Sequence, residues 1–161
     1  MNPLNLKLLF LLLAANGAPI TLRKLLRERW AWPVDGAAHW LDGRPLLGPS
    51  KTWRGLLAAP LATGLAAWLL GWPFLLGAQF GAYAMLGDLV SSFVKRRLGV
   101  ASSGMALGLD QVPEALLPLL AVRAELGLAA ADIAGLVLAF LALELALSRV
   151  LFLLRIREQP Y

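Results

Sequence analysis

The feature that most constrains this chain is an acidic residue, Asp88, inside a long apolar run that ends in three consecutive cations. The run from Pro73 to Val94 has 22 residues and no other formal charge, and a helix of this length crosses a bilayer core of roughly 30 Å. An ionisable side chain at membrane depth is costly and therefore indicates function. At helical spacing Asp88 shares one face with Ser92 and Lys95. This face predicts a site for a cation together with its anionic ligand.

The apolar content of the chain is that of an integral membrane protein. Hydrophobic residues make up 59% of 161 residues, which is more than one soluble domain uses. The sequence contains no cysteine, so disulfides, thiolate metal sites and cysteine nucleophiles are excluded. The formal net charge is +5, but the cations lie beside apolar runs. We therefore expect the membrane and phosphorylated substrates as partners, and no nucleic acid.

The pattern predicts an all-α integral membrane protein, with residues 1–161 forming a single domain of about five transmembrane helices around a polar cleft. The apolar stretches of these spans are residues 4–22, 56–70, 73–94, 115–122 and 133–154. The sequence after Asn16 continues with Gly and Pro, which predicts a break or kink in the first span.

The distribution of basic residues predicts the orientation in the membrane. Thirteen of the 15 basic residues follow the first and third spans or lie in the last helix and tail, which includes Arg155 and Arg157. By the positive-inside rule, the N-terminus is outside, and the C-terminus and the polar cleft are cytoplasmic. Small residues in the third and fifth spans permit close packing, and hence a homodimer.

The connection between the first two spans contains residue types that bind phosphate. Several glycines accompany Lys51, Thr52 and Arg54; glycine lets the backbone approach a ligand closely, and these side chains bind phosphate oxygens. The connection is not a Walker loop, because a serine precedes Lys51 where that motif requires glycine. A basic loop resting on anionic lipid would explain the cations, but not the nearby Asp-Gly pairs that begin at Asp35 and Asp42.

Four blocks of residues occur in order along the chain. They are Pro33-Val34-Asp35-Gly36; Asp42-Gly43-Arg44 with Gly48 and Lys51-Thr52-Trp53-Arg54-Gly55; Gly87-Asp88 with Ser92-Phe93-Val94-Lys95-Arg96-Arg97; and Leu109-Asp110-Gln111. Together they resemble the CDP-archaeol synthase family, which consists of membrane-embedded, CTP-dependent cytidylyltransferases related to the CDP-diacylglycerol synthases. The resemblance covers essentially the whole chain.

The resemblance implies an enzyme that converts CTP and a lipid phosphatidate into a CDP-activated lipid and pyrophosphate in phospholipid biosynthesis. Such an enzyme must hold two anionic substrates together, and metal ions with cationic side chains do this. We expect Asp88 and Asp110 to bind Mg²⁺, which prefers oxygen ligands, and Lys95 to act beside them in catalysis. The residues expected to bind substrate are Asn16, Asp35, Asp42, Lys51, Thr52, Arg54, Ser92, Arg96, Arg97 and Gln111.

The same residues allow other interpretations. Asp110 precedes a proline-containing helix start and could be its N-cap. The cations after the third span could be positive-inside anchors, a role compatible with substrate binding. At the level of the whole protein, the alternative is a non-catalytic membrane module that binds anionic lipid or a partner helix. Glu144, in the fifth span, is left outside the expected site.

Overall fold

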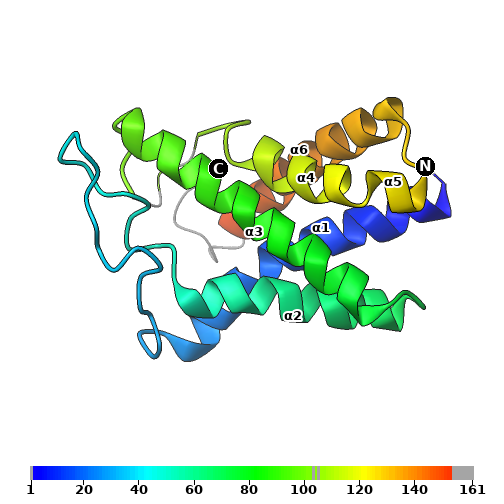
Figure 1. Ribbon diagram of the computed structural model, residues 1–161, viewed down its shortest axis with the longest axis horizontal. Helices are drawn as coiled ribbons and strands as arrows, with labels where there is room; N and C mark the ends of the chain where they lie inside the picture. The colour runs from blue at the N-terminus through cyan, green and yellow to red at the C-terminus, as the bar shows by residue number, and fades with distance from the viewer. Residues whose placement is uncertain (1, 103, 105, 154–161) are drawn as a thin grey trace.

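The chain folds into helices, as the apolar runs predict (Figure 1). The structure, a computed structural model, describes residues 2–102, 104 and 106–153, with side chains as far as Val150. The helices in this part of the chain are α1 (Pro3–Leu26), α2 (Trp53–Leu69), α3 (Phe74–Arg97), α4 (Gln111–Ala121), α5 (Arg123–Leu126) and α6 (Ala130–Leu153). The described residues pair in strand fashion only at two isolated bridges. The all-α fold is therefore confirmed.

Three helices are long and apolar enough to cross a membrane, judged by length and composition: α1, α3 and α6 as far as Val150. The other two predicted spans are shorter, because α2 has 17 residues and α4 has 11 residues, or about 16 Å of helix. The expected number of about five spans is thus not confirmed. The end of the fifth predicted span, residue 154, and the C-terminal tail with Arg155 and Arg157 lie outside the described residues.

Helix α1 runs without interruption through Pro19 as far as Leu26. Of the predicted break or kink after Asn16, the break is therefore wrong, and a kink stays a prediction. Proline lacks only one backbone donor, and the neighbouring turns keep the helix continuous.

Helix α3 packs closely on its neighbours through glycines. A Cβ added at Gly77 would collide with the Thr63 carbonyl of α2, and one at Gly81 would collide with the Thr63 hydroxyl. A Cβ added at Gly87 would collide with the Pro113 carbonyl of α4. These glycines of the third span thus pack against other helices of the same chain. The homodimer stays a prediction.

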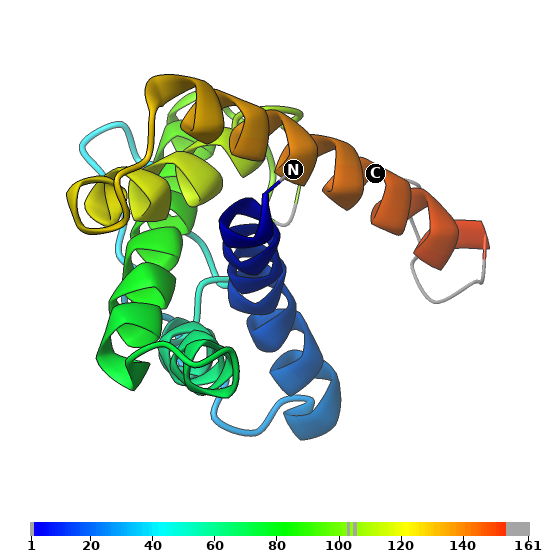
Figure 2. The ribbon, with the colours of Figure 1, turned by 90° about the vertical axis from the view of Figure 1, so that its right-hand side faces the viewer.

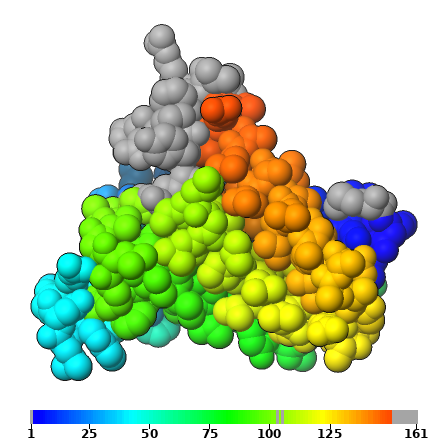
Figure 3. Space-filling model, turned by 90° about the horizontal axis from the view of Figure 1, so that it is seen from above, coloured from blue at the N-terminus to red at the C-terminus, as the bar shows by residue number. Residues whose placement is uncertain are grey.

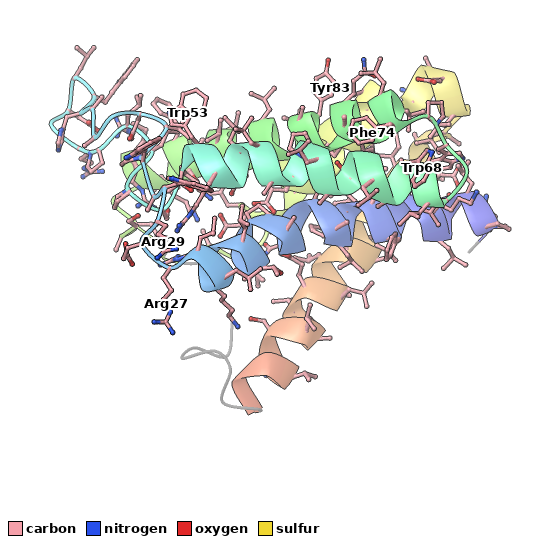
Figure 4. The ribbon with its side chains drawn as sticks, turned by 90° about the horizontal axis from the view of Figure 1, so that it is seen from below. Arg27, Arg29, Trp53, Trp68, Phe74 and Tyr83 are labelled. Carbon is pink, nitrogen blue, oxygen red and sulfur yellow. The ribbon has the colours of Figure 1, made fainter. Side chains whose placement is uncertain are left out.

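Apolar side chains divide between a core and an outer surface. The largest buried apolar side chains are Leu8, Leu11, Leu12, Leu119, Leu136, Phe80 and Phe140. Helix α2 carries a row of exposed apolar side chains at helical spacing: Leu57, Leu61, Leu65 and Trp68. Figure 4 shows Trp68 near one end of α2. An exposed apolar stripe of this kind belongs against lipid in a membrane protein.

Helices α1 and α2 are antiparallel and are tied at both ends by cations. Arg54, in the first turn of α2, donates from Nη1 to the carbonyl oxygens of Arg27 (2.6 Å) and Arg29 (2.5 Å), just after α1. Lys7, in the first turns of α1, donates from Nζ to the Leu70 carbonyl at the end of α2 (2.9 Å) and lies 5.2 Å from the Trp72 ring centroid. These bonds satisfy carbonyls that the helices leave without partners.

The segment between α1 and α2 (the first connection) and the described part of the segment between α3 and α4 (the second connection) lie together at the end of the molecule opposite the N-terminus (Figure 1). Arg44 Nη1 donates to the Arg97 carbonyl at the end of α3 (2.5 Å), and the hydroxyls of Ser50 and Ser102 are 3.3 Å apart. Figure 3 shows the segment around residue 40 projecting at one corner. The basic first connection and the basic last turn of α3 thus lie on one side of the bundle, as the charge pattern predicts.

Candidate functional site

A polar cavity of about 760 Å³ lies where these connections meet the helices. Its walls come from α1, α2, α3, α4, α6 and both connections. Ten of the thirteen predicted site residues line it: Asn16, Lys51, Thr52, Arg54, Asp88, Ser92, Lys95, Arg96, Asp110 and Gln111. The structure therefore gathers side chains that lie far apart in the sequence into one place.

Two ion pairs join the central carboxylates to lysines. Lys51 Nζ lies 2.5 and 2.6 Å from the two carboxylate oxygens of Asp88, with side chains 19% and 18% exposed. Lys95 Nζ lies 2.6 Å from Asp110 Oδ1, with side chains 8% and 18% exposed. Asp88 thus pairs with a lysine from the first connection, since Lys95, two turns along the same helix, lies about 10 Å away along the axis. Partly shielded pairs of this kind interact more strongly than exposed ones.

Several polar atoms in the cavity wall remain without hydrogen bonds in the described part of the chain. They are Ser92 Oγ, Arg96 Nε and Asp110 Oδ1. Asp110 Oδ1 is close to Lys95, but the geometry is not that of a hydrogen bond. Ser92 is almost fully buried. Buried polar atoms without partners are costly, and a polar ligand would satisfy them.

Asp110 immediately precedes α4 but makes no side-chain capping bond to that helix. Its Oδ2 instead accepts a hydrogen bond from the backbone N–H of Ala106, at 3.1 Å. The structure therefore does not support the N-cap interpretation, and the carboxylate faces the cavity.

Asp88 and Asp110 fit a hard divalent cation by their chemistry. Both present carboxylate oxygens to the same cavity, and one of the Asp110 oxygens accepts no hydrogen bond from the described residues. Among the residues that the structure describes, no group of three or more Asp, Glu, His or Cys side chains is arranged to hold a metal. This donor set suits Mg²⁺, which keeps water and substrate phosphates among its ligands.

The cavity is also lined by three acidic residues that the sequence analysis did not assign to the site: Glu28, Glu114 and Glu144. Asn16 Nδ2 donates to Glu114 Oε2 and to Glu144 Oε1, at 2.6 Å each. Glu144 carried the same signal as Asp88, an acid within an apolar span, and should have been included on that ground. Glu114 is buried in α4, where it looked like part of an ordinary helix start.

Asp35, a predicted substrate ligand, lies outside the cavity lining and organises the first connection. Its Oδ2 accepts hydrogen bonds from the backbone N–H groups of Leu47 (2.9 Å) and Gly48 (3.1 Å). Partial burial raises the pKa of Asp35, but these bonds outweigh burial and hold the pKa below its ordinary value of 3.8. Gly48 has φ +95°, and an added Cβ would lie 3.0 Å from Ser102 Oγ. Asp35 thus holds a turn that only glycine fits comfortably.

Asp42 and Arg97, two other predicted ligands, also lie outside the lining. They form an ion pair of 2.9 Å with each other, and Arg97 Nη2 donates to the Pro45 carbonyl at 2.6 Å. The pair ties the first connection to the end of α3. A contact of either side chain with substrate stays a prediction.

The fold and cavity define an all-α membrane protein with an ion-paired polar site at one end of its helix bundle. A solved structure described as an intramembrane enzyme for archaeal membrane lipids biosynthesis has this fold: its TM-score is 0.70 at 34% identity, over 87% of this chain and 89% of that chain. The likeness agrees with an integral membrane protein.

Sequence comparison gives the family. Residues 69–161 match the CarS-like family model for CDP-archaeol synthase. The chain is 34% identical to the CDP-archaeol synthase of Sulfurisphaera tokodaii over 80% of this chain and 81% of the relative. The chain therefore belongs to the CDP-archaeol synthase family, and the resemblance seen in the sequence is confirmed.

Other relatives match over a shorter length. Identity to the CDP-archaeol synthase of Hyperthermus butylicus is 41%, over 62% of this chain and 60% of the relative. The match to the CDP-archaeol synthase of Thermococcus onnurineus is 40% identical and covers 50% of this chain and 54% of the relative. The chain thus matches a little over half the length of these two proteins.

Proposed function

We propose that this chain is a CTP-dependent cytidylyltransferase that converts a lipid phosphatidate and CTP into a CDP-activated lipid and pyrophosphate. The observation that carries the proposal is the pair of shielded ion pairs, Lys51 with Asp88 and Lys95 with Asp110, in one polar cavity of a membrane protein. Such a cavity offers cations for phosphate groups and carboxylates for a metal ion. The names of the relatives point to the same activity.

The reaction requires no protein nucleophile. An oxygen of the lipid phosphate attacks the α-phosphorus of CTP, a new P–O bond forms, and the bond to the bridging oxygen of the β-phosphate breaks. The electron pair of that bond leaves on pyrophosphate. A phosphate monoester is already an anion near neutral pH, so the protein has only to position the two substrates in line and neutralise their charge.

The cavity residues divide this work by their chemistry. Lys51, Lys95 and Arg96 bind phosphate oxygens, and each lysine exchanges its carboxylate partner for substrate when substrate enters. Asp88 and Asp110 would hold Mg²⁺, which when bound would neutralise charge on the phosphates. Thr52, Ser92, Gln111 and Asn16 offer neutral polar contacts from the surrounding wall.

We further propose that the cavity and the C-terminus are cytoplasmic and that the N-terminus is outside. The basic residues of the first connection and of the last turn of α3, at the cavity end, support this orientation, and CTP reaches the site from the cytoplasm. A homodimer through α6 is compatible with Gly135, where nothing lies within 4 Å of an added Cβ.

The test is pyrophosphate release by purified protein in detergent, with CTP and Mg²⁺ and with diacyl and diether phosphatidates offered in parallel. We expect release that requires both lipid and Mg²⁺ and that falls about a hundredfold or more in Asp88→Asn. Asp132→Asn is the matched control, because Asp132 lies in the first turn of α6, away from the cavity lining. A folded protein that releases no pyrophosphate with any lipid would contradict the proposal and favour the non-catalytic module.

A further inference from the structure

The turn that follows α1 has an unusual backbone that is held in place from α2. We call residues 27–32 the basic turn. Arg27 and Trp30 have φ values of +48° and +55°, a region that residues with bulky side chains rarely adopt. Arg54 of α2 donates to the carbonyl oxygens of Arg27 and Arg29. A backbone of this kind persists where its surroundings hold it, and it is typical of functional sites.

The basic turn lies at the depth of the lipid headgroups. The Trp32 carbonyl accepts a hydrogen bond of 3.1 Å from the backbone N–H of Trp53, the first residue of α2. The exposed apolar stripe of α2 begins at Leu57, about 6 Å further along the helix. The headgroup region extends about 5–8 Å beyond the hydrocarbon core on each side. Figure 2 shows the end of α1 at the periphery of the bundle, so the turn is accessible to the surrounding lipids.

The cations of the basic turn lie outside the cavity, while its acidic residue lies inside. Arg27 and Arg29 are exposed, and their side chains make no ion pair or hydrogen bond with the residues that the structure describes. Glu28, between them, lines the cavity, whereas the two arginines do not. Figure 4 shows both arginines at the edge of the molecule. Two positive charges are therefore available to an anionic partner outside the cavity.

Large apolar side chains accompany these cations. Trp30 is 65% exposed and Trp32 is 69% exposed, and Leu25, in the last turn of α1, is 73% exposed. Tryptophan prefers the boundary between lipid and water, because its ring is apolar and its N–H donates a hydrogen bond. Exposed tryptophan and leucine beside arginine are the residue types that bind the surface of an anionic bilayer.

We propose that the basic turn binds the headgroup phosphates of anionic phospholipids in the bilayer around the protein. Arg27 and Arg29 bind phosphate oxygens, and Trp30 and Trp32 lie among the headgroups. Each cation near an anionic membrane surface strengthens binding by about fivefold. The inference goes beyond the proposed function and does not depend on it, because the basic turn lies outside the cavity.

The first test measures which lipid the protein retains. Delipidated protein in detergent is mixed with equal amounts of phosphatidylglycerol and phosphatidylcholine that carry the same chains, and bound lipids are counted by native mass spectrometry. Phosphatidylglycerol is anionic, but it is a phosphodiester and lacks the phosphate monoester that the proposed reaction requires. We expect a preference for phosphatidylglycerol of about tenfold or more, which falls to about threefold or less in Arg27→Gln/Arg29→Gln.

A second double variant provides the matched control. Arg23→Gln/Lys24→Gln removes the same charge from the last turn of α1, but these two side chains line the cavity. This variant should keep the preference for phosphatidylglycerol to within about twofold of that of the unaltered chain. A lipid bound in the cavity would give the opposite result.

A charge-conserving variant separates binding from folding. Arg27→Lys/Arg29→Lys keeps both positive charges, and should retain most of the preference, to within about threefold. The bonds from Arg54 use the backbone carbonyls of the turn, so substitution of the two side chains leaves them in place. If Arg27→Gln/Arg29→Gln does not fold, the single variants Arg27→Gln and Arg29→Gln are scored by the same criteria.

The depth of the tryptophans is tested by fluorescence in phosphatidylglycerol nanodiscs. A lipid with a nitroxide on its headgroup quenches tryptophans at the membrane surface. We expect the quenched part of the signal to fall in Trp30→Phe/Trp32→Phe, because these two rings lie at that depth. An unchanged quenched signal would show that the turn stands clear of the headgroups.

Three results of the lipid measurement would overturn the proposal. Equal retention of the two lipids would show that the protein does not select anionic headgroups. An unchanged preference in Arg27→Gln/Arg29→Gln would place the selection elsewhere. An equal loss in the Arg23→Gln/Lys24→Gln control would show that the total charge of the segment matters, and not the basic turn.

Discussion

Solvent exposure distinguishes the ion pairs at the scale of single residues. The pairs Lys51 with Asp88 and Lys95 with Asp110 are largely shielded, whereas Asp42 in its pair with Arg97 is more exposed. Water and salt screen an exposed pair, while a shielded charge left alone carries a desolvation penalty. Loss of one partner from either of the first two pairs should therefore destabilise the protein more than loss of one partner from the third pair.

A double-mutant cycle on Lys51→Met and Asp88→Asn checks this difference. Each single variant leaves one shielded partner alone, so we expect the double variant to be more stable than the sum of the two losses predicts, by about 1–3 kcal/mol. The measurement is thermal unfolding in detergent. The matched cycle on Arg97→Met and Asp42→Asn should give a coupling of about 1 kcal/mol or less. Equal couplings in the two cycles would refute the role of shielding.

Asp35 predicts a dependence of the first connection on pH. Its folded pKa is depressed, so its contribution to stability is present above the unfolded value of about 3.9 and is lost as the pH falls through the lower folded value. Hydrogen exchange of the backbone N–H groups of Leu47 and Gly48 measures this. Their protection should fall as the chain is acidified below about pH 4, whereas Asp35→Asn should show weaker protection and no such fall. Identical pH profiles would count against the carboxylate.

The residue types of the site could be read from the sequence, but their partners could not. Asp88, Lys51 and Asp110 were recognisable because charges with phosphate-binding or metal-binding chemistry stood out against apolar surroundings. The pairing of Asp88 with Lys51 depends on how α2 and α3 pack, which no local pattern records. Asp42 was not distinguishable from a ligand before its ion pair with Arg97 was seen.

At the scale of the helices, glycine sets how closely α3 approaches its neighbours. Gly81 contacts α2 where a Cβ would collide with the Thr63 hydroxyl and approach the Ala59 carbonyl. We expect Gly81→Ala to destabilise the protein by about 1–3 kcal/mol, because the helices would have to move apart. Thermal unfolding in detergent measures the change.

Gly135 provides the control for this prediction. It lies in α6 with nothing within 4 Å of an added Cβ within the chain, so in the monomer in detergent Gly135→Ala should be neutral or stabilising by up to about 1 kcal/mol through helix propensity. If both alanine variants of the monomer unfold at the same temperature, close packing of α3 is not what Gly81 provides.

Helix positions were more predictable than helix ends. The third span was expected over residues 73–94, and α3 extends to Arg97 because cations are favoured in the last turn of a helix. Helix α1 similarly continues into the basic segment as far as Leu26. Hydropathy locates the part of a helix in lipid, but not the further turns that extend into the headgroup region.

At the scale of the whole molecule, the charge asymmetry predicted which connections meet, whereas the number of spans predicted from hydropathy is not confirmed. The basic first connection does lie beside the basic end of α3, as the hydrogen bond from Arg44 to the Arg97 carbonyl shows. The fourth apolar segment is only the short helix α4, packed mainly against α3 and α6. A segment can be apolar because it is buried against other helices, and its composition does not distinguish this from contact with lipid.

Removal of Mg²⁺ should stop the reaction without unfolding the protein. We expect a chelator to abolish pyrophosphate release and added Mg²⁺ to restore it, since two carboxylates are the proposed ligands. The ion pairs of the cavity are complete without a metal, so the unfolding temperature should change by less than about 2 °C. Activity that persists in excess chelator would refute the metal assignment.

The hydrogen bonds at both ends of α1 and α2 should hold the two helices together even if the chain between them is cut. Arg54 holds the end of α1 and Lys7 holds the end of α2, so neither helix depends on the intervening connection alone for its alignment with the other. A chain cleaved near residue 41 would keep α1 and α2 fastened to each other at both ends of the pair. The protein should therefore reassemble from two co-expressed fragments divided at that point.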